Sequence, residues 1–259
     1  MRLVDTHSHL YHADLQPDMQ EVLQRCKQQQ IRVVILPNIN EDSIAPMNTL
    51  AALSDNELLL LPAMGLHPCD VKENVQTQLQ FFKQAFKDKN YVAVGETGLD
   101  YYWDVSLKEQ QQIAFQTQIE WSVEMQLPLI IHSRNATSDC IDMVANFNGK
   151  AKGVFHCFAG TIAEAEAIIS MGFYLGIGGS LTYKNSNELR EVVKHVGIEN
   201  ILLETDAPYL PPVPYRGKRN ESSYVSIVAE HIATLKNMAI GDVSEITTKN
   251  AQKLFAFSI

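Results

Sequence analysis

The chain has 259 residues, of which 46% are hydrophobic and 20% are charged. This composition is that of a globular protein with a sizeable core, and it excludes a collagen-like, coiled-coil or wholly disordered chain. The 21 basic and 30 acidic residues give a formal net charge of −9, so the overall field of the protein does not attract polyanions. Any binding of nucleic acid must therefore depend on a local group of basic residues.

Short apolar runs recur along the chain, and most are rich in Val, Ile or Leu without strict alternation, as buried parallel strands are. They cover residues 3–4, 31–36, 58–64, 91–94, 128–131, 153–155, 173–177 and 201–203. Segments with helical periodicity lie between or after them, at residues 19–29, 107–125, 163–171, 189–195, 223–236 and 243–255.

This alternation predicts an α/β fold, specifically a (β/α)8 TIM barrel that forms one domain over residues 1–259. A doubly wound open sheet is the alternative. That fold would be favoured by a glycine-rich phosphate loop after the first strand, which the sequence lacks.

The sequence has no sign of a membrane or secretory segment. The N-terminus lacks an apolar signal core, and the longest apolar run, residues 58–66, contains Pro62 and is too short to span a bilayer. The four cysteines are widely spaced without a CxxC pair, so neither a disulfide framework nor a zinc knuckle is expected. We therefore expect a reduced, soluble, cytoplasmic protein without membrane association or an obligate protein partner.

In a barrel, catalytic side chains come from the carboxyl ends of several strands, so the residues after each apolar run are informative. The first run is followed by His7 and His9, and alternate residues of an extended chain can present two imidazoles to one metal ion. The fourth run is followed by Glu96, a carboxylate that needs a partner such as a cation if it is buried. The fifth and sixth runs are followed by His132 and His156.

Two carboxylates follow the eighth run. Asp206 is the better ligand candidate because it lies further toward the strand end, whereas Glu204 is expected to hydrogen-bond a ligand histidine from outside. Asp100 is expected either to hydrogen-bond a ligand histidine in the same way or to cap a helix. Four histidines and two carboxylates are too many for one four-coordinate ion, so the pattern predicts a two-metal site.

Other polar residues near these strand ends are candidate substrate contacts. His67 is one, although it could equally be a loop histidine held before a proline. Arg134 could clamp a phosphate or form a surface ion pair. Arg216, Lys218 and Arg219 concentrate three basic residues just after the last candidate strand, where the alternative is an ordinary solvated loop.

The chain resembles the TatD family of metal-dependent hydrolases, within the amidohydrolase-like superfamily. The resemblance covers nearly the whole chain in order, and it rests on residues 5–10, 65–68, 95–101, 132–134, 156–158, 204–208, 216–221 and 250–255. It implies a distorted TIM barrel with a divalent metal centre and DNase or related phosphodiesterase activity. It also implies that one metal ion is held by His7, His9 and Asp206, the other by His132 and His156, and that Glu96 bridges them.

Three residues differ from the family pattern, and none of them is an implied metal ligand. Asn135 stands where Asp is frequent, Ala159 where Ser is common, and Ser222 where Pro is usual. These departures bear on substrate preference rather than on metal binding.

The resemblance and the residues together predict hydrolysis of DNA ends or single strands. Metal coordination lowers the pKa of water from near 16 to roughly 7 in the zinc case, and the resulting hydroxide would attack phosphorus. Asp206 would orient this water and accept its proton, with Glu96 as the second catalytic carboxylate. The aromatic residues 101–103 would either stack on unpaired bases or pack as a lid.

The identity of the two expected divalent ions stays open among Zn, Mn, Mg, Ni, Co and Fe. Four imidazoles disfavour Mg on ligand softness, whereas family members are often assayed with Mg. Two alternative functions also stay open. One is hydrolysis of a small-molecule amide, lactone or phosphoester, for which many relatives use a carboxylated lysine where this chain has Glu96. The other is a non-catalytic, metal-dependent scaffold, which has no need of six convergent ligands.

Overall fold

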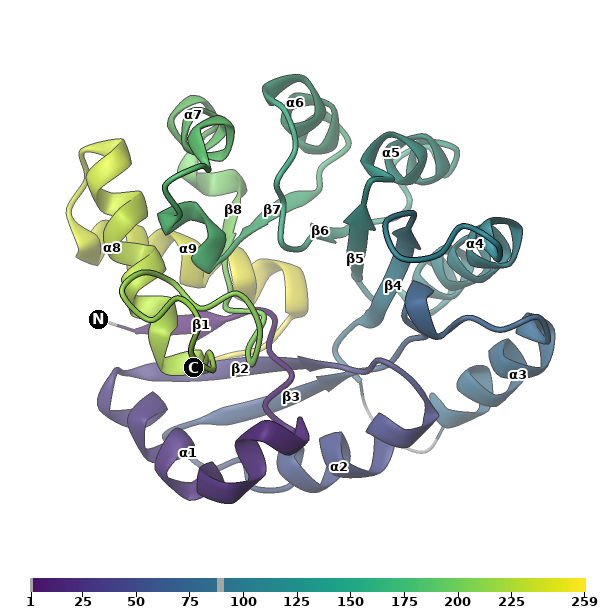
Figure 1. The fold of residues 1–259 in the computed structure, drawn as a ribbon, viewed down its shortest axis with the longest axis horizontal. Coiled ribbons are helices and arrows are strands. Elements are labelled where there is room, and N and C mark those ends of the chain that lie inside the picture. Colours follow the sequence, from purple (N-terminus) through teal and green to yellow (C-terminus); the bar gives the residue numbers. More distant parts are fainter. Residues whose placement is uncertain (1, 88–90) are drawn as a thin grey trace.

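A computed structural model describes residues 2–87 and 91–259 (Figure 1). Met1 and residues 88–90, which belong to the domain range expected for 1–259, lie outside the described residues. Strands and helices alternate along the chain, and the helices surround the strands on the outside (Figure 1). The α/β class and the (β/α)8 barrel are therefore confirmed.

The elements are as follows. The strands are β1 (Leu3–Asp5), β2 (Ile31–Pro37), β3 (Leu59–Ala63), β4 (Val94–Asp100), β5 (Leu129–Arg134), β6 (Gly153–Phe155), β7 (Tyr174–Ile177) and β8 (Ile201–Leu203). The α-helices are α1 (Met19–Gln28), α2 (Glu41–Ala51), α3 (Val75–Ala85), α4 (Lys108–Met125), α5 (Thr137–Ala145), α6 (Ile162–Ser170), α7 (Asn187–His195), α8 (Val225–Lys236) and α9 (Ile240–Phe255). Short 3-10 turns are η1 (Ala13–Asp18), η2 (Pro68–Asp70), η3 (Gly179–Thr182), η4 (Ile198–Asn200) and η5 (Ser222–Tyr224).

The barrel is distorted, because the pairing between neighbouring strands is interrupted at two places. β1, β2 and β3 form one parallel sheet, and β4 to β8 form a second in chain order. Single parallel bridges, Ser8 with Ala207 and Met64 with Val94, join the two sheets. The distortion that the resemblance implied is thus present.

The strands place alternate side chains in two apolar cores. In β2, Val33 and Ile35 face the barrel interior, whereas Val34 and Leu36 pack against the surrounding helices. The interior cluster also contains Ala251 and Phe255 of α9. The apolar content that the composition predicted is therefore divided between the barrel interior and the layer beneath the helices.

β4 differs from the prediction, and the difference positions Glu96. The expected strand covered residues 91–94, but β4 begins at Val94 and runs to Asp100, so residues 91–93 precede the strand and Glu96 lies within it. Val94 pairs with Leu129 and Thr97 with Ile131, so β4 has one residue more than β5 across this interval. Such a bulge re-aims the side chains beside it.

Gly98 shows how closely β4 and β5 approach here. Its φ is 136°, and a Cβ at this position would lie 2.0 Å from the carbonyl oxygen of His132. Only glycine allows both this conformation and this contact. β5 is also longer than expected, so that His132 and Arg134 are strand residues rather than loop residues.

The helices α2, α3 and α5 were not predicted. α2 contains Pro46 in its interior, a residue that normally argues against a helix because it removes one backbone hydrogen bond. Its start is fixed instead by a capping box in which Asn40 and Ser43 bond reciprocally. In the described part of the chain, no helix is both long enough and apolar enough to cross a membrane.

Candidate metal centre

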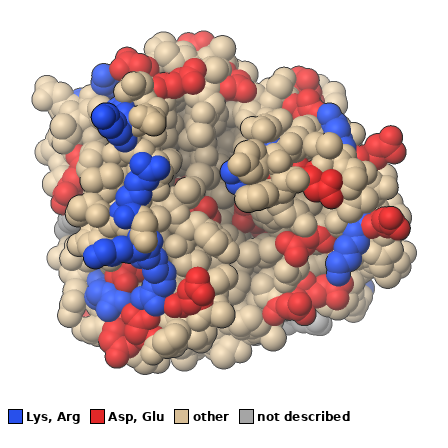
Figure 2. Space-filling view, in the orientation of Figure 1, with Lys and Arg blue, Asp and Glu red and all other residues tan. Residues whose placement is uncertain are grey.

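The six residues predicted as metal ligands lie together at the carboxyl ends of the strands. His7, His9, Glu96 and His156 are buried, with at most 4% exposure. Figure 2 shows that this face of the molecule is hollowed at its centre, with acidic atoms inside the hollow and basic side chains gathered along one side. The barrel therefore converges titratable groups from far-apart segments on one depression.

Glu96 is the centre of this arrangement, because its two carboxylate oxygens face different groups. Oε2 lies 3.2 Å from Nε2 of His7 and 3.3 Å from Nε2 of His9. Asp206 Oδ1 lies 3.7 Å and 3.6 Å from the same two nitrogens. We name His7, His9 and Asp206 the His7 cluster.

The other oxygen of Glu96 faces a second pair of imidazoles. Oε1 lies 2.8 Å from Nε2 of His156 and 3.0 Å from Nδ1 of His132, and these two nitrogens are 3.4 Å apart. We name His132 and His156 the His132 cluster. A single carboxylate thus contacts two groups of potential ligands, and the groups also touch one another, because the rings of His7 and His156 stack at 3.8 Å.

Backbone contacts between the ends of β1 and β8 hold the His7 cluster together. The amide of His9 donates to the carbonyl of Ala207 at 2.7 Å, and the amide of Asp206 donates to the carbonyl of His7 at 2.9 Å. Asp206 adopts a left-handed conformation with φ 57°, which turns the chain at this point. Asp5 reinforces the connection by accepting hydrogen bonds from the amide and hydroxyl of Thr205 at 3.0 and 2.6 Å.

Asp100 supports the His132 cluster from outside. Its Oδ2 lies 2.9 Å from Nε2 of His132. Burial disfavours the charged form of Asp100, but hydrogen bonds from His132 and from the Tyr102 amide outweigh it and lower the pKa of Asp100. The ionised carboxylate can only accept, so the Nε2 of His132 carries a proton and Nδ1 is the nitrogen that faces Glu96.

Glu204 occupies a similar position behind His156. Its Oε1 accepts a hydrogen bond from the amide of Cys157 at 2.6 Å and lies 3.7 Å from Nδ1 of His156. A Cβ at position 176 would lie 2.2 Å from Oε2 of Glu204, so Gly176 leaves the space that this buried carboxylate needs. Both residues expected outside the ligands therefore contact a histidine of the His132 cluster.

His67 also reaches Glu96, but its protonation differs from that of His132. Its Nδ1 accepts a hydrogen bond from the amide of Cys69 at 3.1 Å, so a neutral ring carries its proton on Nε2. Burial lowers the pKa of His67, which favours the neutral ring. Nε2 lies 3.3 Å from Oε1 of Glu96, and the geometry therefore makes His67 a hydrogen-bond donor into the site.

The predicted basic contacts do not share one environment. Arg134 and Arg216 are exposed, and their guanidinium groups lie 3.8 Å from the ring centre of Tyr102 and 4.6 Å from that of Tyr183. Lys218 is exposed as well.

Arg219 is instead paired within the protein. Its guanidinium donates to both carboxylate oxygens of Asp18, at 2.6 and 2.7 Å. This ion pair ties the basic loop to η1. Arg219 therefore has an anionic partner that the sequence did not reveal, because the two residues are 201 positions apart.

Sequence reasoning missed two residues of the site. Asp5 was noted only as part of a motif, and burial raises its pKa to about 7. No motif marks Tyr11 as a site residue, yet its hydroxyl oxygen lies 2.9 Å from Nδ1 of His9. Its position two residues after a candidate ligand was the one available signal.

The donor groups fit divalent metal ions. Metal binding requires a neutral imidazole, and in that state the lone pair on Nδ1 of His132 faces a carboxylate oxygen of Glu96 only 3.0 Å away. Two acceptors at this distance repel one another unless a cation lies beside both. Imidazoles combined with carboxylates suit first-row transition metals.

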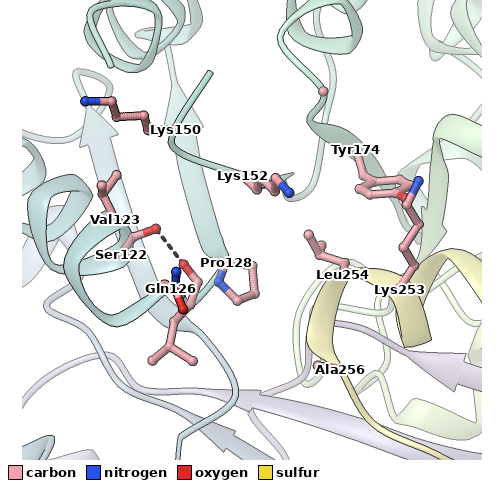
Figure 3. A pocket seen from close by; sticks show the side chains of 12 residues that line it. Ser122, Val123, Gln126, Pro128, Lys150, Lys152, Tyr174, Lys253, Leu254 and Ala256 are labelled. Carbon is pink, nitrogen blue, oxygen red and sulfur yellow. Dashed lines mark hydrogen bonds between the residues drawn. The ribbon is translucent and has the colours of Figure 1, made fainter. Parts of the chain in front are cut away.

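The base of the barrel contains a pocket of a different kind. Its volume is about 780 Å³, and its lining includes Pro128 just before β5, Tyr174 at the start of β7, and Lys253 and Leu254 of α9 (Figure 3). Its lining residues include lysines but no histidine and no carboxylate. This pocket lacks the convergent ligands found at the other end.

A parallel α/β barrel with buried histidines and carboxylates at the carboxyl ends of its strands defines a barrel metallohydrolase. The sequence matches the family described as TatD related DNase over residues 4–256. YabD of Bacillus subtilis (strain 168), an uncharacterized metal-dependent hydrolase, is 39% identical over 98% of each chain. YcfH of Escherichia coli (strain K12), described in the same words, is 32% identical and aligns with 98% of this chain and 96% of its own.

A solved structure agrees with these sequence relatives. The crystal structure of YjjV, a TatD homologue from Escherichia coli K12, matches with a TM-score of 0.91 at 28% identity over 99% of each chain. The chain therefore belongs to the TatD family of metal-dependent hydrolases.

Proposed function

We propose that this protein hydrolyses phosphodiester bonds in DNA, at ends or in single strands, with one divalent ion on each side of Glu96. The proposal is carried by the two oxygens of Glu96, which face separate imidazole pairs at 2.8 to 3.3 Å. A shared carboxylate suits two-metal sites, where the ions lie about 3.5–4 Å apart. The proposed ligands are the His7 cluster for one ion, the His132 cluster for the other, and Glu96 for both.

The bound ions would supply Lewis-acid stabilisation of a phosphoryl oxygen and a lowered pKa for coordinated water. Asp206 is the chain's own base. Its side chain is 15% exposed, whereas His7 and Glu96 are almost fully enclosed, so it lies where water and substrate can enter. Burial raises the pKa of Asp206 to about 6. This value belongs to the metal-free site, and divalent ions beside Asp206 would lower it. The carboxylate would therefore be ionised at neutral pH and available to accept a proton from the attacking water.

Four groups are proposed to hold the phosphate. The Nε2–H of His67 is directed into the site and can donate to a phosphoryl oxygen. Arg134 and Arg216 have exposed guanidinium groups that can bind phosphate bidentately. Lys218 adds a charge on the same loop as Arg216, whereas Arg219 is left out because Asp18 already pairs with it.

The aromatic residues after β4 favour an unpaired strand as the substrate. Tyr102 and Trp103 are 52% and 70% exposed, and the Arg134 guanidinium covers one face of the Tyr102 ring, so bases can reach the remaining ring surface. Base stacking on such rings is typical of proteins that bind single-stranded nucleic acid. We propose that one domain spanning residues 1–259 both binds and cuts, since these groups and the ligands come from the same barrel.

End-labelled single- and double-stranded oligonucleotides test this function. We expect Mn²⁺-loaded protein to shorten the labelled strand, chelator to abolish the reaction, and Asp206→Asn to slow it by about 10²-fold or more. The matched control is Asp242→Asn, which changes an exposed carboxylate on α9 and should leave the rate unchanged. Turnover of amides, lactones or phosphotriesters without cleavage of DNA would instead identify a small-molecule hydrolase. Chelator-sensitive partner binding without turnover of any ester would identify a scaffold.

A further inference from the structure

Tyr11 lies behind His9, on the side away from Glu96. Its side chain is buried, with 5% exposure, and its ring is nearly perpendicular to that of His9 at an interplanar angle of 86°. The hydroxyl oxygen is 2.9 Å from Nδ1 of His9, and the hydroxyl donates to the carbonyl of Pro37 at 2.5 Å. Pro37 is the last residue of β2, so Tyr11 connects the loop after β1 to the end of the neighbouring strand.

The contacts of this hydroxyl with Pro37 and His9 determine where the proton of His9 lies. A tyrosine hydroxyl has one proton, and here that proton is directed at the carbonyl of Pro37. Toward His9 the oxygen can therefore only accept, so Nδ1 of His9 is the donor. A neutral His9 consequently has its lone pair on Nε2, the nitrogen that lies 3.3 Å from Oε2 of Glu96 and 3.6 Å from Oδ1 of Asp206.

The same hydroxyl also fixes the direction in which the ring points. The backbone of His9 is held to the β8 side, because its amide donates to the carbonyl of Ala207 at 2.7 Å. The ring is held to the β2 side through Tyr11. His7 has no comparable support, since its Nδ1 lacks a hydrogen-bond partner in the described structure.

We propose that Tyr11 is a positioning residue that keeps His9 in the Nδ1–H tautomer and aims Nε2 at a divalent ion in the His7 cluster. This inference rests on the proposed metal centre. The hydrogen bond joins two neutral groups, unlike the one from His132 to the Asp100 carboxylate. Tyr11 therefore selects the ligating nitrogen of His9 without adding negative charge behind it.

Tautomers can be observed directly in the wild-type protein. Long-range proton–nitrogen correlation spectra of the metal-free protein should show a neutral His9 with its proton on Nδ1. A neutral His9 with its proton on Nε2 would overturn the inference, and this measurement needs no variant.

The substitution Tyr11→Phe removes the hydroxyl and keeps the ring. Competition titration with Zn²⁺ and a chromophoric chelator should show about 10- to 100-fold weaker binding of one ion, with the second ion little affected. The His9 spectrum should change to a mixture of tautomers, and kcat for the oligonucleotide should fall while KM stays within a few fold. The matched control is Tyr91→Phe, which removes another buried hydroxyl that accepts from Asn48, and it should leave Zn²⁺ affinity unchanged.

The outcomes separate this inference from the proposed function. Wild-type Zn²⁺ affinity in Tyr11→Phe together with an unchanged His9 tautomer would overturn the role of Tyr11. A wild-type protein that binds Zn²⁺ but does not cut DNA would overturn the proposed function alone. A wild-type protein that binds no Zn²⁺ would overturn both.

Discussion

The two sides of Glu96 use the same ligand type but surround it differently. Behind the His132 cluster lie two carboxylates: Asp100, within hydrogen-bond distance of His132 at 2.9 Å, and Glu204, which lies 3.7 Å from Nδ1 of His156 and is too far for a hydrogen bond. Behind the His7 cluster, His9 contacts a neutral hydroxyl, and His7 has no partner at Nδ1 among the described residues. Imidazoles of identical chemistry are thus given different electrostatic support.

This difference changes the histidine pKa values of the two clusters in the metal-free protein. Burial opposes the charged form of His132 and His156, but the nearby carboxylates outweigh it and raise the pKa of both residues. In the His7 cluster, burial and the neighbouring His156 lower the pKa of His7. Protons therefore compete with metal mainly on one side of Glu96, where the carboxylates also make the imidazoles stronger ligands.

The largest effect is expected from Glu96→Gln, which removes the charge that both clusters share. Both ions should bind more weakly. The rate of DNA cleavage should fall by more than the roughly 10- to 100-fold that is typical when a residue hydrogen-bonded to a metal ligand is removed. Metal content after dialysis and the rate of oligonucleotide cleavage measure this. Glu124→Gln, an exposed carboxylate paired with Lys83, is the control. Two retained ions and a near-normal rate would mean that Glu96 does not bridge the clusters.

A one-sided effect is expected from Asp100→Asn. This variant removes the charge behind His132 and should weaken one ion by about 10- to 100-fold while the other keeps its affinity. Chelator competition with Mn²⁺ resolves the two binding steps. The control Asp139→Asn changes a partly exposed carboxylate that accepts from the hydroxyl of Tyr101. Equal weakening of both ions would remove the distinction between the clusters.

The pH dependence of metal binding should come from the His132 cluster. The raised pKa values of His132 and His156 mean that these rings stabilise the metal-free fold at low pH and lose that contribution as pH rises through the raised pKa. Near neutral pH, metal must displace these protons, so binding should release protons and strengthen as pH rises. Calorimetry in buffers of different ionisation enthalpy measures the release, which Asp100→Asn should reduce. Binding heats independent of buffer would contradict this account.

Smaller effects are expected from the basic residues at the mouth. Arg134→Ala and Arg216→Ala should each reduce the slope of DNA affinity against salt by about 1, because each removes one phosphate contact. Lys253→Gln, in the pocket at the opposite end, is the matched control and should leave the slope unchanged.

Arg219→Ala should behave differently from its neighbours in the loop. Its ion pair with Asp18 is partly exposed, so the free energy of unfolding should fall by up to about 1 kcal/mol, with the salt slope unchanged. Denaturant unfolding and salt titration distinguish the two effects. A reduced salt slope without a loss of stability would mean that Arg219 contacts phosphate instead of stabilising the fold.

Much of this arrangement could be predicted because it follows from strand periodicity. Apolar runs located the strands, and the barrel rule then indicated that His7, His9, His132 and His156 would meet at one end. The bulge in β4 could not be predicted, because it depends on how β4 and β5 pair rather than on composition.

Contacts between segments that are distant in the sequence could not be predicted either. The pairing of Arg219 with Asp18 and the hydrogen bond from Tyr11 to Pro37 join residues that are neighbours only after the barrel has formed. Histidine tautomers depend on such contacts. The sequence therefore indicated which histidines gather, but it did not separate His67, a donor, from the rings with free lone pairs.

Anomalous diffraction from crystals soaked in Mn²⁺ tests directly whether Glu96 bridges two ions. Two peaks are expected, one beside each carboxylate oxygen of Glu96, the first among His7, His9 and Asp206 and the second between His132 and His156. A single peak, or an ion held by Nε2 of His67, would contradict it.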